Sequence, residues 1–244
     1  MAVINPKNKY RKFIAFGCSF TSGHNYYAAG SWGSYLGNLL GCEYSLQGHG
    51  GSSSVSILSR MIGYCETNDM TNCCVGIQWS EWTRRELWLP EENRYTAFNI
   101  AAIQLSDQYA HMKNHLDFFG PFFFDPMENI IRAINSMVLA KAYLESKNID
   151  FVQYEGIGSI LDECYPFPKP ANKSQDLNLI KDPYKLKLLK HPTFFTKYGS
   201  MMRFMFEHEL FVNDPDTNKD FHPNPAFAEW WAGQIYEYLH SINP

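Results

Sequence analysis

Two segments at opposite ends of the sequence contain residue types that could act together in nucleophilic catalysis. In the first, residues 16–21 (FGCSFT), Ser19 follows directly on an apolar run. In the second, residues 219–223 (KDFHP), Asp220 lies two residues before His222. Serine alone is a weak nucleophile, so catalysis requires a base, an acid that orients the base and donors for the developing oxyanion. One short segment could therefore supply both the base and the acid for Ser19.

The elements that must position these residues alternate between strand and helix. Apolar runs predict four strands, at residues 12–16, 42–46, 73–78 and 149–154. Helical spacing and capping signals predict four helices, at residues 32–40, at 53–65, from 125 onwards and from 224 onwards. This alternation is typical of an α/β fold with a mostly parallel sheet covered by helices. Ser19 is then expected where the first strand ends, in the crevice where such folds hold reactive groups.

Two stretches, at about residues 80–125 and 160–207, do not fit the alternation. The first is rich in Trp and charged residues, and the second is rich in Pro, Lys and Asp. Loops of this length in a compact domain are usually lids, binding loops or disordered segments. We therefore expect two long loop insertions in a domain that spans residues 1–244.

The composition excludes several classes of protein. A chain of 244 residues suits one α/β domain, and a net charge of −4 argues against a protein that binds nucleic acid by neutralising phosphates. No apolar run has the length of a signal peptide or a membrane span, so we expect a soluble protein without a membrane partner. The six cysteines show no CxxC pair, which argues against a disulfide framework or a zinc site.

The segments around Ser19 and His222 resemble motifs of a known family. Residues 17–21 (GCSFT) resemble the first motif of the SGNH/GDSL hydrolases, and residues 220–223 (DFHP), followed by a helix, are similar to their last motif. The resemblance spans nearly the whole chain and implies a flavodoxin-like three-layer α/β/α sandwich. It also implies that Ser19 is the nucleophile of an ester hydrolase and that Asp220 and His222 activate it.

The same resemblance implies an oxyanion hole. Its donors are the backbone N–H of the nucleophile and that of Gly50, with Gly48 or Gly51 as alternatives if the alignment shifts. The Asn that family members carry after the third strand is absent. Gln78 or Ser80 could replace it, because either side chain can donate a hydrogen bond from the end of that strand.

Other parts of the motifs depart from the usual family pattern. Residues 75–86 (VGIQWSEWTRRE) are similar to the divergent SGNH-like proteins that tailed bacteriophages often encode, which implies a cytoplasmic or virion-associated protein. Many family members carry the Asp three residues before the His, where this chain has Lys219, so Asp214 and Asp216 are alternative acids. Cys18 is a second conceivable nucleophile, although adjacent residues point in different directions and the resemblance places Ser19 at the reactive position.

Three residues after the third strand are candidate substrate contacts: Trp79, Trp82 and Arg84. The tryptophan rings could stack on sugars, but core or lid packing fits them equally well, because large aromatic side chains dominate burial. Arg84 could contact the substrate or form an ion pair behind the site.

The expected function is removal of a small acyl group, such as O-acetyl from a carbohydrate, by a serine esterase without metal or cofactor. Its substrate is a small-molecule or carbohydrate ester, and the sequence leaves the oligomeric state open. The missing Asn supports an alternative, a catalytically degenerate SGNH-fold protein that binds a glycan or belongs to a virion. A third interpretation treats residues 19–23 as an anion-binding loop, although it lacks the Lys of a P-loop.

Overall fold

A computed structural model describes most of the chain. The described residues are 9–22, 30–82, 84–89, 94–99, 126–157, 193–195, 197–198, 200–212 and 220–242. Within them, no helix is both long enough and apolar enough to cross a membrane.

A four-stranded parallel sheet forms the centre of the molecule. Its strands are β1 (Lys12–Gly17), β2 (Glu43–Gly48), β3 (Cys73–Trp79) and β6 (Asp150–Glu155). They lie in the order β2-β1-β3-β6, and every neighbouring pair is parallel. The chain therefore adds β2 on one side of β1 and β3 on the other, which is the strand order at the switch point of flavodoxin-like sheets. The predicted sheet, including β2 as an edge strand, is confirmed.

After Lys12, strand β1 is apolar because both of its faces are buried. Phe13 and Ala15 contribute to one hydrophobic cluster, whereas Ile14 and Phe16 contribute to the other. Parallel strands covered on both sides read as continuous apolar runs, since alternate side chains enter two cores. The edge strand β2 is less completely covered than β1, and it begins with exposed residues.

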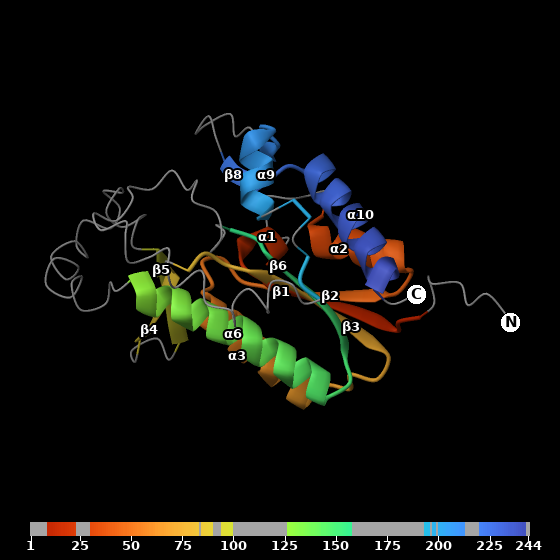
Figure 1. Ribbon diagram of the computed structural model, residues 1–244, viewed down its shortest axis with the longest axis horizontal. Coiled ribbons are helices and arrows are strands. Elements are labelled where there is room, and N and C mark those ends of the chain that lie inside the picture. Colours follow the sequence, from red (N-terminus) through yellow and green to blue (C-terminus); the bar gives the residue numbers. More distant parts are fainter. Residues whose placement is uncertain are drawn as a thin grey trace, which may run out of the picture.

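Helices cover both faces of the sheet (Figure 1). On one face lie α3 (Ser54–Thr67) and α6 (Pro126–Ser146), and on the other lie α2 (Trp32–Leu40) and α10 (Pro225–Ile242). Two shorter helices, α1 (Ser19–Ser22) and α9 (Met201–Glu207), belong to the same half as α2 and α10. The predicted α/β fold, a parallel sheet between two helical layers, is therefore confirmed.

The helix boundaries follow from two local signals. Gly41 adopts the left-handed conformation, with φ of 68°, and its N–H donates to the last turn of α2, so that the helix ends there as predicted. Asn224 begins α10, because its side-chain oxygen accepts a hydrogen bond from the Phe227 N–H at 2.8 Å. Pro225 then occupies the first helical position, where its missing N–H costs nothing.

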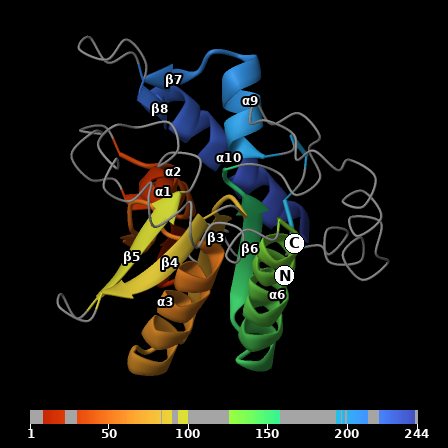
Figure 2. The same cartoon turned by 90° about the vertical axis from the view of Figure 1, so that its left-hand side faces the viewer.

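The two expected insertions contain more regular structure than the sequence indicated. Within residues 80–125, β4 (Arg84–Leu89) and β5 (Arg94–Asn99) form an antiparallel hairpin, which lies outside the main sheet near the start of α6 (Figures 1 and 2). Within residues 160–207, Thr193 to Phe195 runs alongside β6 through two backbone hydrogen bonds with Gln153. Residues 100–125 and 158–192 lie outside the described part of the chain.

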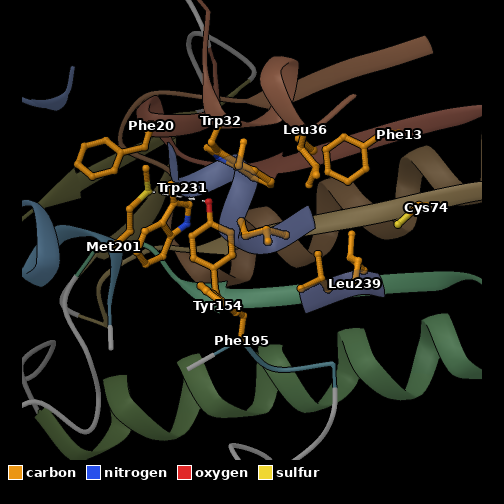
Figure 3. Packing of buried hydrophobic residues seen from close by; sticks show 14 of the residues in the cluster. Phe13, Phe20, Trp32, Leu36, Cys74, Tyr154, Phe195, Met201, Trp231 and Leu239 are labelled. Carbon is orange, nitrogen blue, oxygen red and sulfur yellow. Dashed lines mark hydrogen bonds between the residues drawn. The ribbon is translucent and has the colours of Figure 1, made fainter. Parts of the chain in front are cut away.

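Aromatic rings fill the core between the sheet and α2, α9 and α10 (Figure 3). Trp32 contacts Tyr154 edge-on, with ring centroids 5.2 Å apart, and Tyr154 in turn contacts Trp231 at 5.6 Å. Phe13 packs edge-on against Trp32 from β1. Residues from β1, α2, β6 and α10 therefore share one rigid cluster, which holds the sheet against these helices.

We predict that Gly76→Ala destabilises the protein. A Cβ on Gly76 would lie 2.5 Å from the Phe13 ring and 2.8 Å from Trp32, and neither buried ring has room to move. Overpacking of this kind costs about 1–3 kcal/mol of unfolding free energy, measurable by chemical denaturation. Gly63→Ala is the matched control, because nothing lies within 4 Å of its Cβ position in α3. The control should gain up to about 1 kcal/mol from helix propensity, and a similar gain in Gly76→Ala would contradict the prediction.

Candidate active site

Ser19 lies where β1 ends and α1 begins. Strand β1 ends at Gly17, and Ser19 is the first residue of the short helix. The Cys18 carbonyl accepts hydrogen bonds from the N–H groups of Thr21 at 3.0 Å and Ser22 at 3.2 Å, which closes the turn. The Ser19 side chain is half-buried at the carboxyl edge of the sheet, the place where α/β folds hold ligands.

Two glycines allow the backbone to approach this turn closely. A Cβ on Gly17 would collide with the Thr21 hydroxyl and the Gln78 side chain. A Cβ on Gly48, at the end of β2, would collide with backbone atoms of Cys18, Thr21 and Ser22. The ends of β1 and β2 therefore pack directly against α1, and no larger residue fits at either position without moving backbone or buried side chains.

A buried polar network lies beneath the turn. Thr21 donates its hydroxyl to Gln78 Oε1 at 2.8 Å and accepts a hydrogen bond from Trp32 Nε1 at 3.0 Å. Gln78 Nε2 also contacts Cys18 Sγ at 3.3 Å. Gln78, Thr21 and Cys18 are fully buried, so these hydrogen bonds replace those that water would make. The network joins α1 to β3 and α2, and this role of Thr21 was not predicted from the sequence.

His222 is held next to the same turn. It lies in β8 (Asp220–Pro223), which pairs antiparallel with β7 (Phe211–Val212) just before α10. Its ring contacts the Phe20 ring edge-on, with centroids 5.2 Å apart, and Phe20 follows Ser19 directly in α1. Burial lowers the pKa of His222 below the ordinary histidine value, because a charged imidazolium is poorly solvated there. The imidazole is therefore neutral at pH 7, the form that accepts a proton.

The acid partners predicted for His222 are only partly described. The backbone of Asp220 forms part of β8, but its side chain lies outside the described residues. Asp214 and Asp216 also lie outside them. The assignment of Asp220 as the orienting acid therefore stays a prediction.

The proposed oxyanion glycine lies in a tight turn after β2. The Ser52 N–H and hydroxyl both donate to the His49 carbonyl, at 3.3 and 2.9 Å, which closes a turn over Gly50 and Gly51. Gly51 has φ of 74°, so the turn needs glycine at that position. Nothing lies within 4 Å of the Cβ position of Gly50, which leaves open space beside its backbone. The His49 N–H donates to the Gly17 carbonyl at 3.2 Å and ties this turn to the end of β1.

The two candidates for the missing Asn have different surroundings. The Gln78 carboxamide is fully buried in the network with Thr21 and Cys18. Ser80 follows β3 directly, and its hydroxyl is buried with no hydrogen-bond partner in the part of the chain that the structure describes. The Ser80 carbonyl accepts a hydrogen bond from the Ser54 hydroxyl at 3.4 Å, so the residue lies against the start of α3. A buried hydroxyl without a partner is costly and requires an explanation.

The candidate substrate contacts differ in exposure. Trp79 is fully buried, and its Nε1 donates to Gln153 Oε1 at 2.9 Å, so protein atoms cover the ring that was considered for sugar stacking. Trp82 is only partly buried, against the cluster around α3 and α6. Arg84 forms an ion pair with the buried Glu81, with Nε and Oε1 2.7 Å apart.

Comparisons with known proteins yield similar folds only. No family profile matches the chain, and no curated protein matches it at a significant level. Similar solved structures include a member of the lipolytic protein G-D-S-L family from Veillonella parvula, with a TM-score of 0.48 and 12% identity, covering 93% of this chain and 98% of that one. A GDSL-like lipase from Bacteroides thetaiotaomicron has a TM-score of 0.47 and 11% identity, covering 95% and 89%.

A third similar structure is an acetyl xylan esterase from the rumen bacterium Butyrivibrio proteoclasticus. Its TM-score is 0.47 at 12% identity, and the match covers 96% of this chain and 64% of that one. Such similarity is too low to assign a family. Evidence for a function therefore comes from the residues of this chain.

We predict that Thr21→Val destabilises the protein by about 1–3 kcal/mol. The variant keeps the shape of the side chain but leaves the buried Trp32 Nε1 and Gln78 Oε1 without the hydroxyl that pairs them, and an unsatisfied buried group costs about that much. Thr67→Val is the matched control, because the Thr67 hydroxyl is exposed, donates to carbonyls of its own helix and accepts only from the adjacent, exposed Asn68 side chain among the described residues. Its effect should stay within about 0.5 kcal/mol in the same denaturation experiment. Equal losses in the two variants would contradict a structural role for the network.

Proposed function

We propose that the chain is a serine ester hydrolase with Ser19 as nucleophile and His222 as base. The observation that carries this proposal is the contact between Phe20 and His222, which brings the imidazole beside the helix that begins with Ser19. The lowered pKa of His222 supports it, since a general base must be neutral at the working pH.

The reaction is acyl transfer from an ester to water. His222 accepts the Ser19 proton as Ser19 Oγ attacks the carbonyl carbon, and the backbone N–H groups of Ser19 and Gly50 bind the negatively charged oxygen. The tetrahedral intermediate expels the alcohol, which takes its proton from the imidazolium. Water, deprotonated by His222, then attacks the acyl-enzyme, and the carboxylic acid leaves with Ser19 restored. Asp220 orients His222 in this scheme.

Ser80 is the better candidate for the third oxyanion donor. Its hydroxyl has no hydrogen-bond partner among the described residues, whereas the Gln78 carboxamide is committed to the turn that holds Ser19. Ser80 follows β3, where the resemblance to the SGNH/GDSL hydrolases would place the missing Asn, and its hydroxyl is able to donate a hydrogen bond. The open space beside the Gly50 backbone supports an approach of the substrate from this side of the turn.

The substrate proposed for this site is a small acyl ester, including O-acetyl groups on carbohydrates. The resemblance to the SGNH/GDSL hydrolases supports the acyl part of this proposal. The carbohydrate part depends on Trp82, since the Trp79 ring is enclosed in the core.

We expect Ser19→Ala to lower hydrolysis of p-nitrophenyl acetate by at least about 10³-fold, because the variant loses the group that forms the acyl-enzyme. The control is Ser22→Ala in the same helix, where the hydroxyl donates to the Ser19 carbonyl at 3.0 Å rather than to substrate. The control should keep activity within about tenfold of the parent protein.

A fluorophosphonate probe separates this proposal from a protein that only binds glycans. The probe should label Ser19 in the parent protein and in Ser22→Ala, but not in Ser19→Ala. An unlabelled, folded parent protein would favour the binding protein, and residual hydrolysis by Ser19→Ala at the parent rate would exclude Ser19 as nucleophile.

Ser80→Ala should lower kcat by about 10²-fold without loss of stability. Removal of one oxyanion donor typically costs about 10²–10³ in rate, whereas the Ser80 hydroxyl forms no hydrogen bond with the described residues that would be lost. Ser136→Ala is the matched control, because its buried hydroxyl in α6 bonds to the Arg132 carbonyl. The control should show the reverse pattern, a small loss of stability with unchanged kcat. Unchanged kcat in Ser80→Ala would return the role to Gln78 or leave the site with two donors.

A further inference from the structure

Arg60 connects the ends of two strands and the turn between β2 and α3. It lies in α3 and is half-buried. Its Nη2 donates to the Gly17 carbonyl at 3.0 Å and to the Ser52 hydroxyl at 3.1 Å, and its Nε donates to the Gln47 carbonyl at 3.1 Å. A fourth hydrogen bond, from Nη1 to the Ser56 hydroxyl at 3.3 Å, fixes the guanidinium on its own helix.

The acceptors of Arg60 belong to the elements that carry the proposed chemistry. Gly17 is the last residue of β1, two positions before Ser19. Gln47 belongs to β2, directly before the turn that contains Gly50. The Ser52 hydroxyl, which Arg60 contacts, itself donates to the His49 carbonyl and closes that turn. One side chain therefore links the nucleophile segment to both ends of the oxyanion turn.

Only a guanidinium suits this arrangement. Its donors are held in one plane in a fixed geometry, so separate acceptors bonded to it are held at fixed positions relative to one another. A lysine ammonium is a point charge on a flexible stem and cannot reach the same acceptors with the same geometry. The neighbouring residues Ile57 and Met61 of α3 are buried in the core, so Arg60 lies at the edge of the buried face of the helix.

We propose that Arg60 is a positioning residue, which sets the distance between the Ser19 helix and the Gly50 turn and thereby the geometry of the oxyanion hole. This inference rests on the proposed ester hydrolysis. Oxyanion donors act mainly in the transition state, so their displacement lowers kcat more than it changes KM. A displacement of about 1 Å is enough to cost about 10²-fold in rate.

The test compares Arg60→Met, Arg60→Lys and Arg132→Met. Arg60→Met should lower kcat by about 10²-fold with KM within about threefold of the parent value, and Arg60→Lys should recover only part of the loss. Arg132→Met is the matched control, because Arg132 is an exposed arginine of α6 that pairs with Glu128. All values are expressed per active site titrated with the fluorophosphonate probe, so that a merely less stable protein does not score as a slower one.

Hydrogen exchange provides a readout that does not depend on catalysis. In Arg60→Met the backbone amides of residues 17–22 and 47–52 should exchange faster, while those of α6 and α10 should not. If Arg60→Met does not fold, Ser52→Ala is measured instead, because it removes the hydroxyl that contacts Arg60 and the His49 carbonyl, while the Ser52 N–H still donates to that carbonyl and closes the turn. That variant should lower kcat by about tenfold with KM unchanged.

The outcomes distinguish the two proposals. If the parent protein hydrolyses esters and Arg60→Met retains its kcat per titrated site, the role of Arg60 is overturned and the esterase stands. If kcat falls no more in Arg60→Met than in Arg132→Met, the role is overturned as well. If the folded parent protein neither hydrolyses esters nor reacts with the probe, both proposals fall.

Discussion

A buried side-chain amide needs hydrogen-bond partners, and the candidate site depends on the partners of the Gln78 carboxamide. Its carboxamide meets the hydroxyl of Thr21 and the thiol of Cys18, and Thr21 also accepts the indole N–H of Trp32. Because these groups are inaccessible to water, any movement of the turn that contains Ser19 leaves several polar atoms unpaired at once. This buried polar network thereby holds the half-buried Ser19 in a fixed position at the edge of the sheet.

Much of the fold could be predicted because its signals are local. A strand buried on both faces is mostly apolar, as β1 and β3 are, and Gly41 and Asn224 mark helix ends by their backbone and side-chain chemistry. The hairpin of β4 and β5 escaped prediction because its segments carry mixed charged and aromatic residues with no clear two-residue period. Such strands depend on pairing with each other rather than on burial in the main sheet.

The details of the site depend on facts that the sequence does not contain. Along β3, alternate residues face opposite layers, so Trp79 enters the core beside α3 and α6 while Gln78 turns toward Trp32. The sequence shows this alternation but not which face meets the nucleophile turn, and it therefore left Gln78 and Ser80 equivalent. Arg60 was missed because a charged residue beside an apolar helix face usually indicates solvent exposure.

The contact between Phe20 and His222 joins residues from opposite ends of the sequence. Contacts of this range are entropically costly, because the long loop between the two residues must close before they are made. A partly folded chain with β1, β2 and β3 in place would already present Ser19 at the end of its strand, but without the imidazole. Under the proposed hydrolysis, a chain in which this contact has not formed would therefore carry a serine without its base.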